Sequence, residues 1–592
     1  MSDRNIYISQ YFKNVFNSNI IDSFRPRYSN VHIILEELLD TCKLVEKNII
    51  SNYYLPKIIE EAIILINDDV ILNQDKNIKR RNFLLKKLSL TGKKIGEIDC
   101  FIQFLKLELV FMRKKYLNSL KEEIFAISDK RKKVDKYPKQ KIRRLLGSFI
   151  SECMFVGVSF KSLKKLGSLK KEYSRTDIKK IIDKILSKKS FNFYLLLFGV
   201  DNSAIDFFVK TFKNTKDKSF LVHKKWPTKI IPKAFKSEMS RRKYVVFEIK
   251  KRKFLDCYGG LLEIRTALEP IVNIVHIFYP GKQLYFFNKG FIMDYSSNKK
   301  SSTINYIDVV NYRCVNNETV DEKIFSCFNL PEEIQNKLFN SASYLNISLN
   351  EFNIINKYLN AWVSIEIIFN TVKNDSGDEN GKTVGYINEF VPKIFSIFYV
   401  SKIIKFLFQR VLSLKLDINE KFIINNKHDV IVFLEYLKKE ENKAILFNRL
   451  VGEEELRETL FYFVDIIFDN KKLSKLLEKH KEKILFHLQR LYRLRNILIH
   501  GGEKNIKADG LYNISSIAML CTNCQEYSTQ LISYISEIYI NLPEKYERDK
   551  LTMFNILNLF SVLYDKIVYK LDKDDFDFNE LKKMFSPIDF IE

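Results

Sequence analysis

The stretch "KILFHLQRLYRLRNILIHGG" (residues 483–502) decides how the C-terminal half of this chain folds. Its apolar residues recur every three or four positions, which predicts a helix with one buried face. At 100° per residue, that face collects Ile484, His487, Leu491, Leu494 and Leu498. Arg493, Asn496 and His500 form a stripe nearly opposite, facing away from the core, and a helix with one packed and one solvated side explains such a stripe. Gly501 suits a helix end, so His500 is expected at the exposed carboxyl end, which favours a cation.

Helical periodicity extends over most of the chain on both sides of this stretch. It predicts helices at 349–372, 386–414, 428–439, 452–468, 471–500, 512–541 and 550–571. Residues from about 28 to 190 are also predicted to be helical, and residues 1–25 are expected to form a loosely attached arm. Only 17 Gly and 11 Pro occur among 592 residues, which favours a mostly helical protein.

The segment from about 190 to 315 has a different pattern of short β-type runs. These runs lie at 191–200, 243–251, 272–280 and 282–295, with a helix near 254–271 and a hairpin turn at 280–283. The expected fold class is therefore mainly α with a small α+β middle domain. We expect four parts: a basic helical N-terminal region (1–190), the α+β domain (191–330), a C-terminal helical bundle (340–545), and a final helix and tail (546–592).

The positive charge is concentrated in one part of the chain. The formal net charge is +26, and residues 79–189 contain 32 Lys and Arg against 11 Asp and Glu, a net of +21. A field of this kind attracts polyanions such as RNA. The excess of Lys over Arg, with abundant Ile, Asn and Tyr, is also what an AT-rich genome produces, so codon bias is an alternative source for part of the charge.

Other patterns exclude several classes of protein. The eight cysteines are scattered and form no disulfide framework, and the N-terminus lacks the apolar core of a signal peptide. A soluble cytoplasmic protein is therefore expected. Cys521 and Cys524 form a single C-x-x-C without two further ligands nearby, so we expect buried cysteines, no metal site and no cofactor. Neither a phosphate-binding glycine loop nor a serine nucleophile motif is present.

The end of the motif helix resembles a known nuclease motif. Arg495-Asn496-Ile497-Leu498-Ile499-His500 is similar to the R-x4-6-H motif of the HEPN superfamily, and Trp362 and Glu366 in 359–369 are similar to the W-x-x-x-E pattern in the first helix of its ApeA-type domains. The resemblance covers roughly 345–545. It implies a metal-independent endoribonuclease whose catalytic residues are Arg495, Asn496 and His500.

The chemistry of these residue types suits RNA cleavage by attack of a neighbouring 2′-hydroxyl. His500 would handle a proton near neutral pH, the arginine would neutralise charge on the phosphoryl oxygens, and Asn496 would orient His500. Products would carry a 2′,3′-cyclic phosphate and a 5′-hydroxyl. The resemblance further implies RNA as substrate, a homodimer or higher homo-oligomer formed through this domain, a phage-derived trigger as a partner, and a role in anti-phage abortive infection. A non-catalytic RNA-binding scaffold and a housekeeping RNA-processing enzyme are the alternatives.

The arginine that contacts the phosphate is left open by the helical geometry. Arg495 lies about 140° from His500 around an ideal helix, which places it nearer the buried apolar face. A charge there needs a partner, and we propose Glu366. The alternative is that Arg495 and Glu366 form a purely structural pair and that Arg493 is the phosphate contact.

The basic segment around residues 130–144 is a candidate RNA-binding surface. Its charged residues are Lys130, Arg131, Lys132, Lys133, Lys139, Lys141, Arg143 and Arg144. Candidate stacking groups in the wider basic region are Tyr116, Tyr137, Phe149 and Phe155. The alternative is that these aromatic side chains belong to the core and the charges only solvate a face.

Overall fold

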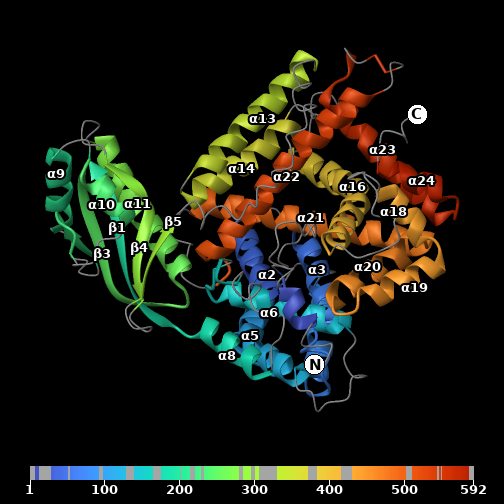
Figure 1. Cartoon of the computed structure of the whole chain (residues 1–592), viewed down its shortest axis with the longest axis horizontal. Helices are drawn as coiled ribbons and strands as arrows, with labels where there is room; N and C mark the ends of the chain where they lie inside the picture. The colour runs from blue at the N-terminus through green and yellow to red at the C-terminus, as the bar shows by residue number, and fades with distance from the viewer. Residues whose placement is uncertain are drawn as a thin grey trace.

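The structure, a computed structural model, is mainly helical with one small sheet, as the sequence predicts (Figure 1). It describes residues 7–12, 29–50, 52, 54–91, 98–128, 139–159, 161–163, 175–199, 202–213, 220–227, 233–278, 284–294, 300–305, 330–351, 353–370, 383–414, 430–501, 510–542, 546–547 and 550–585. No helix within these ranges is long and apolar enough to cross a membrane.

The C-terminal bundle is built around the long helix that carries the motif. Its helices are α13 (Glu332–Asn350), α14 (Ile354–Phe369), α16 (Thr383–Ser413), α18 (Val430–Leu437), α19 (Glu440–Arg449), α20 (Glu454–Ile467), α21 (Asn470–Gly501), α22 (Ile514–Asn541), α23 (Met553–Asp572) and α24 (Phe578–Lys583). The predicted helix at 349–372 is wrong at its start, because the Asn353 side chain accepts hydrogen bonds from the backbone N–H groups of Ile355 and Asn356 and begins α14 there. Helix α23 packs against α16 and α21, so it belongs to the bundle.

The N-terminal region is also helical, as predicted. Its elements are α2 (Val31–Glu46), α3 (Tyr54–Asp68), a short 3-10 turn (Asp75–Asn77), α4 (Ile78–Thr91), α5 (Ile98–Ile127), α6 (Lys139–Phe155) and α8 (Arg175–Leu186). The expectation of a loose N-terminal arm is wrong for residues 7–12. Tyr7 and Ile8 are buried, and the Gln10 side chain donates to the Gly452 carbonyl oxygen at 2.6 Å. This contact ties the start of the chain to the C-terminal bundle.

The middle domain is a five-stranded antiparallel sheet in the order β2-β3-β1-β4-β5. Its elements are β1 (Lys189–Gly199), α9 (Asn202–Lys213), β2 (Phe220–His223), α10 (Lys233–Met239), β3 (Lys243–Phe254), α11 (Cys257–Phe278), β4 (Leu284–Asp294) and β5 (Lys300–Asn305). Central strand β1 is buried on both faces, which explains its unbroken apolar run. A Cβ on Gly290 would lie 2.6 Å from the Leu261 side chain, so this glycine lets α11 pack closely on β4.

One predicted strand and its hairpin are wrong. Residues 272–278 continue helix α11 rather than forming a strand, so no hairpin joins them to β4. The β-branched run "VNIVHIF" contains apolar residues at helical as well as alternating spacing, and packing against the sheet selects the helix. The predicted turn at 280–283 lies outside the described residues.

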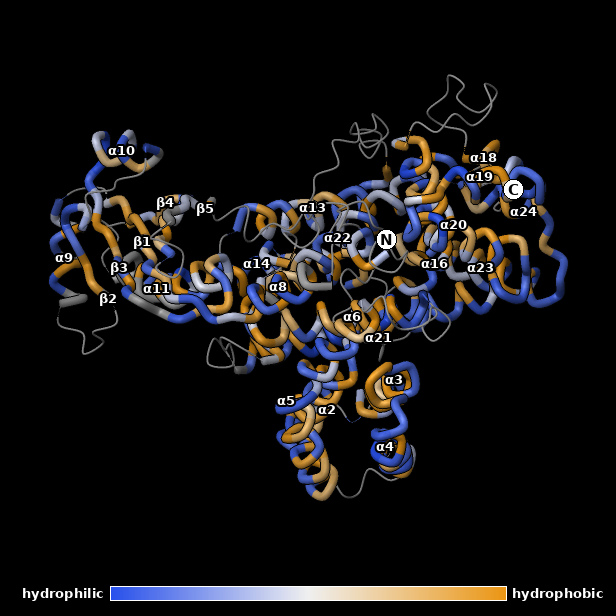
Figure 2. The backbone as a smooth tube through the Cα atoms, turned by 60° about the horizontal axis from the view of Figure 1, so that its bottom comes forward, coloured by the Kyte–Doolittle hydropathy of each residue, from blue (hydrophilic) through white to orange (hydrophobic). Residues whose placement is uncertain are grey.

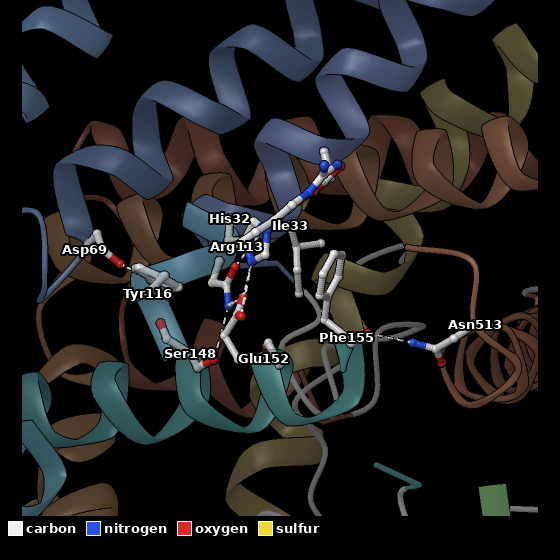
Figure 3. Close-up of polar contacts among 12 residues, drawn as sticks. His32, Ile33, Asp69, Arg113, Tyr116, Ser148, Glu152, Phe155 and Asn513 are labelled. Carbon is white, nitrogen blue, oxygen red and sulfur yellow. Dashed lines mark hydrogen bonds and ion pairs between the residues drawn. The ribbon is translucent and has the colours of Figure 1, made fainter. Parts of the chain in front are cut away.

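A buried ionic cluster holds α2, α5 and α6 together (Figure 3). His32 of α2 lies with Nδ1 3.0 Å from the Glu152 carboxylate of α6, and its Nε2 is 3.4 Å from Glu36, which Arg113 of α5 binds in turn. Burial alone would lower the pKa of His32, but Glu152 and Glu36 outweigh it and raise the pKa to about 9. The imidazole is therefore a buried cation at neutral pH.

Replacing His32 with Gln should remove a pH-dependent part of the stability. The folded pKa is raised from 6.5 to about 9, so the contribution is fully present below pH 6.5 and is lost as the pH rises through 9. The shift corresponds to about 3 kcal/mol at most. Urea unfolding should show the wild-type advantage over His32→Gln shrinking between pH 6 and pH 9.5; a difference that stays constant over this range would contradict the account.

Candidate functional site

Two residues of the predicted solvated stripe on α21 are in fact buried. Arg493 and Asn496 are each 4% exposed, whereas His500 is exposed near the carboxyl end of the helix. The prediction of a solvated stripe is wrong because the N-terminal region covers that side of the helix, with α2 and α3 lying next to α21 (Figure 1). The residue pattern of one helix does not predict that a segment more than 400 residues away in the sequence covers it.

The covering helices bind the motif helix through a buried cluster of four charged groups. Arg490 lies with Nη2 2.8 Å from Glu61 of α3, and its Nε contacts Glu37 of α2. Arg493 Nη2 lies 3.1 Å from the other oxygen of Glu37. Burial would lower the pKa of Arg490, but Glu37 and Glu61 outweigh it and raise the pKa, so the guanidinium stays charged. Two cations and two carboxylates balance, which buried charges require.

Arg495 has the partner that the sequence analysis proposed. Its Nη2 lies 4.0 Å from Glu366 Oε1, and its Nη1 donates to Asn496 Oδ1 at 3.1 Å. The Arg495 side chain is 30% exposed, against 5% for Arg493. Because Arg493 is buried and bound by Glu37, Arg495 is the better placed of the two to contact a phosphate from solvent.

Helix α14 holds Glu366 in place beside the motif. Trp362 is fully buried with its ring centroid 6.0 Å from that of Tyr492, and the Tyr358 hydroxyl donates to the Leu491 carbonyl oxygen. Glu366 follows Trp362 by one helical turn and therefore lies on the same side of α14. Trp362 is thus anchored in the core, and Glu366, one turn later on the same side of α14, lies beside Arg495.

Helix α21 carries three histidines, and the two in the motif stretch, His487 and His500, have different environments. His487 is fully buried, and burial together with the nearby Arg490 charge lowers its pKa to about 3. The Asn523 amide donates to His487 Nε2 at 3.3 Å, so Nδ1 carries the hydrogen and donates to the Tyr527 hydroxyl at 3.0 Å. His487 is therefore a neutral structural group. His500 is exposed and, among the described residues, has no hydrogen-bond partner, which leaves its imidazole accessible.

The described part of the basic segment faces the protein's own carboxylates. Lys139 lies 2.6 Å from Glu458, Arg144 lies 3.1 Å from Asp68, and Lys141 lies 4.0 Å from Glu123. Arg143 is half-buried. Lys130, Arg131, Lys132 and Lys133 lie outside the described residues, so their RNA-binding role stays a prediction.

The aromatic stacking candidates near this segment are core residues. Tyr116 and Phe149 are buried, and the Tyr116 hydroxyl binds Asp69, so the idea that they stack on RNA bases is wrong. Phe155 is half-buried with its ring centroid 4.5 Å from that of His32. Tyr137 lies outside the described residues. Helix packing at α2, α5 and α6 accounts for the described members of this set.

The residues that support the motif from the N-terminal half were not predicted from the sequence. Glu37 of α2 and Glu61 of α3 are buried carboxylates, and Arg490 is their shared partner on α21. The signal was the acidic pair within "ILEELLD" (34–40), since acidic residues on a buried helix face need cationic partners. Cys521 and Cys524 are buried, as expected, and the described residues contain no cluster of three His, Cys, Asp or Glu suited to a metal ion.

The chain matches no protein-family model, no curated protein and no solved structure at a significant level. The resemblance to HEPN ribonucleases therefore depends on the motif residues themselves. The geometry of Arg495, Glu366 and His500 is the basis on which a function is argued.

Breaking the buried cluster should destabilise the protein in a way that a second substitution repairs. Glu37→Gln leaves two arginines against Glu61 alone, and an uncompensated buried charge costs about 3–5 kcal/mol. Glu37→Gln combined with Arg493→Gln leaves one balanced pair, Arg490 and Glu61, and should recover part of that loss. Unfolding free energies of the four proteins of the cycle measure the coupling.

The matched control is Glu60→Gln, because Glu60 neighbours Glu61 but is exposed and pairs with exposed Lys57. This control should change stability by no more than about 0.5 kcal/mol. Strict additivity of the Glu37 and Arg493 substitutions would show that the two side chains do not interact as described.

Proposed function

We propose that this protein is a metal-independent endoribonuclease of the HEPN type, acting inside the cell, with its chemistry at the carboxyl end of α21. The observation that carries the proposal is the placement of Arg495, which is partly exposed and bound by Glu366 and Asn496, one to two turns before the exposed His500. A cation and an imidazole on one accessible helix end are the two groups that cleavage by a 2′-hydroxyl needs.

Each residue has a distinct role in the proposed reaction. His500 transfers the proton between the attacking 2′-hydroxyl, or the leaving 5′-oxygen, and solvent. Arg495 neutralises charge that develops on the non-bridging phosphoryl oxygens, and bidentate guanidinium geometry suits this contact. Glu366 and Asn496 are positioning residues, because they bind the Arg495 guanidinium. Arg493 is a structural residue bound by Glu37 rather than a phosphate contact.

A composite site would account for the sparse set of catalytic groups on one chain. We propose that two copies bring the ends of their α21 helices together, so that one histidine acts as base and the other as acid. Control of such a toxic enzyme by a phage-derived trigger in an abortive-infection response is part of the same proposal. Tight control agrees with a motif helix that the N-terminal half covers on one side.

The proposal predicts the effect of single substitutions on RNA cleavage. Wild-type protein should cleave labelled RNA in the presence of EDTA, with specific activity rising with protein concentration. His500→Ala should reduce the rate by at least about 100-fold. Arg495→Ala should cause a similar loss, since removing one transition-state charge contact costs about 2.7–4 kcal/mol.

The matched control is His223→Ala, which removes a partly exposed histidine on the sheet, far from α21 in the fold (Figure 1). This variant should retain wild-type activity. Full activity of His500→Ala would refute the assignment of the site. Cleavage that EDTA abolishes would refute the metal-independent mechanism.

A growth assay separates the proposed toxin from the alternative functions. Overexpressed wild-type protein, under phage challenge where a trigger is needed, should stop cell growth, whereas His500→Ala should be harmless because the RNA damage depends on its imidazole. Colony counts over a range of inducer concentrations measure the difference. Equal growth of both strains with and without phage would contradict a toxic ribonuclease and favour a scaffold.

A further inference from the structure

Helices α4 and α5 lie in a part of the molecule that projects from the rest (Figure 2). Both helices expose apolar side chains. Phe83 and Leu90 of α4 are 47% and 56% exposed, and Leu107 and Val110 of α5 are 72% and 50% exposed. Leu107 is the most exposed large apolar residue in the described chain. Isolated exposed apolar residues are common, but four on two adjacent helices indicate an interaction surface.

Lysines alternate with these apolar residues along both helices. On α4, Phe83, Lys86, Lys87 and Leu90 follow one another at three-and-four spacing and therefore share one face. On α5, Leu107 and Val110 are followed by Lys114 on the same side of the helix. Residues 78–91 and 98–118 together contain nine basic and two acidic residues, so the two helices carry a net positive charge.

The two stripes lie beside one another. The ring centroids of Phe83 and Phe104 are 5.8 Å apart, and Arg80 Nη2 lies 2.7 Å from Glu108, so α4 and α5 are in contact. At 100° per residue, Leu90 and Leu107 flank this contact on the same side of an antiparallel pair. We call the surface formed by Phe83, Lys86, Lys87, Leu90, Leu107, Val110 and Lys114 the α4–α5 surface.

We propose that the α4–α5 surface is a docking site for an acidic protein segment with an apolar face, such as an amphipathic helix. The positive charge selects an acidic partner, and the interleaved apolar residues give it an area to bury. RNA fits less well, because Phe83 is the one aromatic side chain among the four exposed apolar residues of this surface, and the other three offer no stacking platform. An anionic membrane would attract the same lysines and apolar side chains, so vesicle binding is measured beside peptide binding.

The helices that form this surface also hold the motif helix. Helix α4 packs against α3, which carries Glu61, and α5 packs against α2, which carries Glu37. A partner bound to α4 and α5 therefore contacts helices that pack directly on α2 and α3, the elements that bind Arg490 and Arg493. Docking would control RNA cleavage through these helices, and this consequence rests on the proposed ribonuclease function. The docking itself does not depend on that function.

The test uses full-length protein and a fluorescein-labelled synthetic helical peptide with leucines on one face and glutamates beside them. Fluorescence anisotropy should show binding to the wild type that weakens with salt and falls at least about tenfold in Leu107→Ser/Val110→Ser. Charge reversal in Lys86→Glu/Lys87→Glu should give a similar loss. The control Val562→Ser/Tyr569→Ser removes equally exposed apolar side chains from α23 and should bind as the wild type does.

Three results would overturn the proposal. The first is an absence of peptide binding, and the second is equal binding of a peptide whose glutamates are replaced by lysines. The third is binding of another ligand in place of the peptide. This ligand would be phosphatidylserine vesicles, or oligouridylate measured with the His500→Ala protein, and its binding would be lost in Leu107→Ser/Val110→Ser. Because anisotropy requires no cleavage, a protein without ribonuclease activity still tests the docking site.

Discussion

The buried pairing of Arg490 and Arg493 with Glu37 and Glu61 is the constraint on which the rest of the structure depends. These four buried groups join the N-terminal and C-terminal halves of the chain, so neither half can lose its charges without leaving the other uncompensated. The pairing fixes which side of α21 faces the N-terminal helices, and it therefore fixes where the motif end of the helix is exposed.

This constraint divides the arginines of the motif helix between two tasks. Arg490 and Arg493 hold the fold together, and Arg495, two residues further on, lies at the surface with Glu366. The histidines divide in the same way, because His487 is buried and neutral whereas His500 is exposed. Helix α21 thus packs on the N-terminal helices and on its own bundle and still leaves its carboxyl end accessible.

Much of the fold follows from local pattern, while the environment of the site does not. Periodicity predicts α21 almost to the residue, and the need for a counter-charge correctly pairs Arg495 with Glu366, since both depend on neighbours within one bundle. The burial of Arg493 and Asn496 depends on α2 and α3, whose approach no local pattern encodes. The misassigned strand at 272–278 has the same origin, because packing on the sheet decides between two periodicities that the residues allow.

The chemical identity of the RNA ends tests the central claim most directly. Mass spectrometry of oligonucleotides cleaved by the wild-type protein in a chelator should find 2′,3′-cyclic phosphate and 5′-hydroxyl ends, and none above background with His500→Ala. These ends are the signature of attack by the neighbouring 2′-hydroxyl, and their loss with His500→Ala would assign the proton transfer to that imidazole. Products with 5′-phosphate and 3′-hydroxyl ends would contradict the proposed mechanism. RNA that stays intact with folded wild-type protein at every protein concentration would contradict it too.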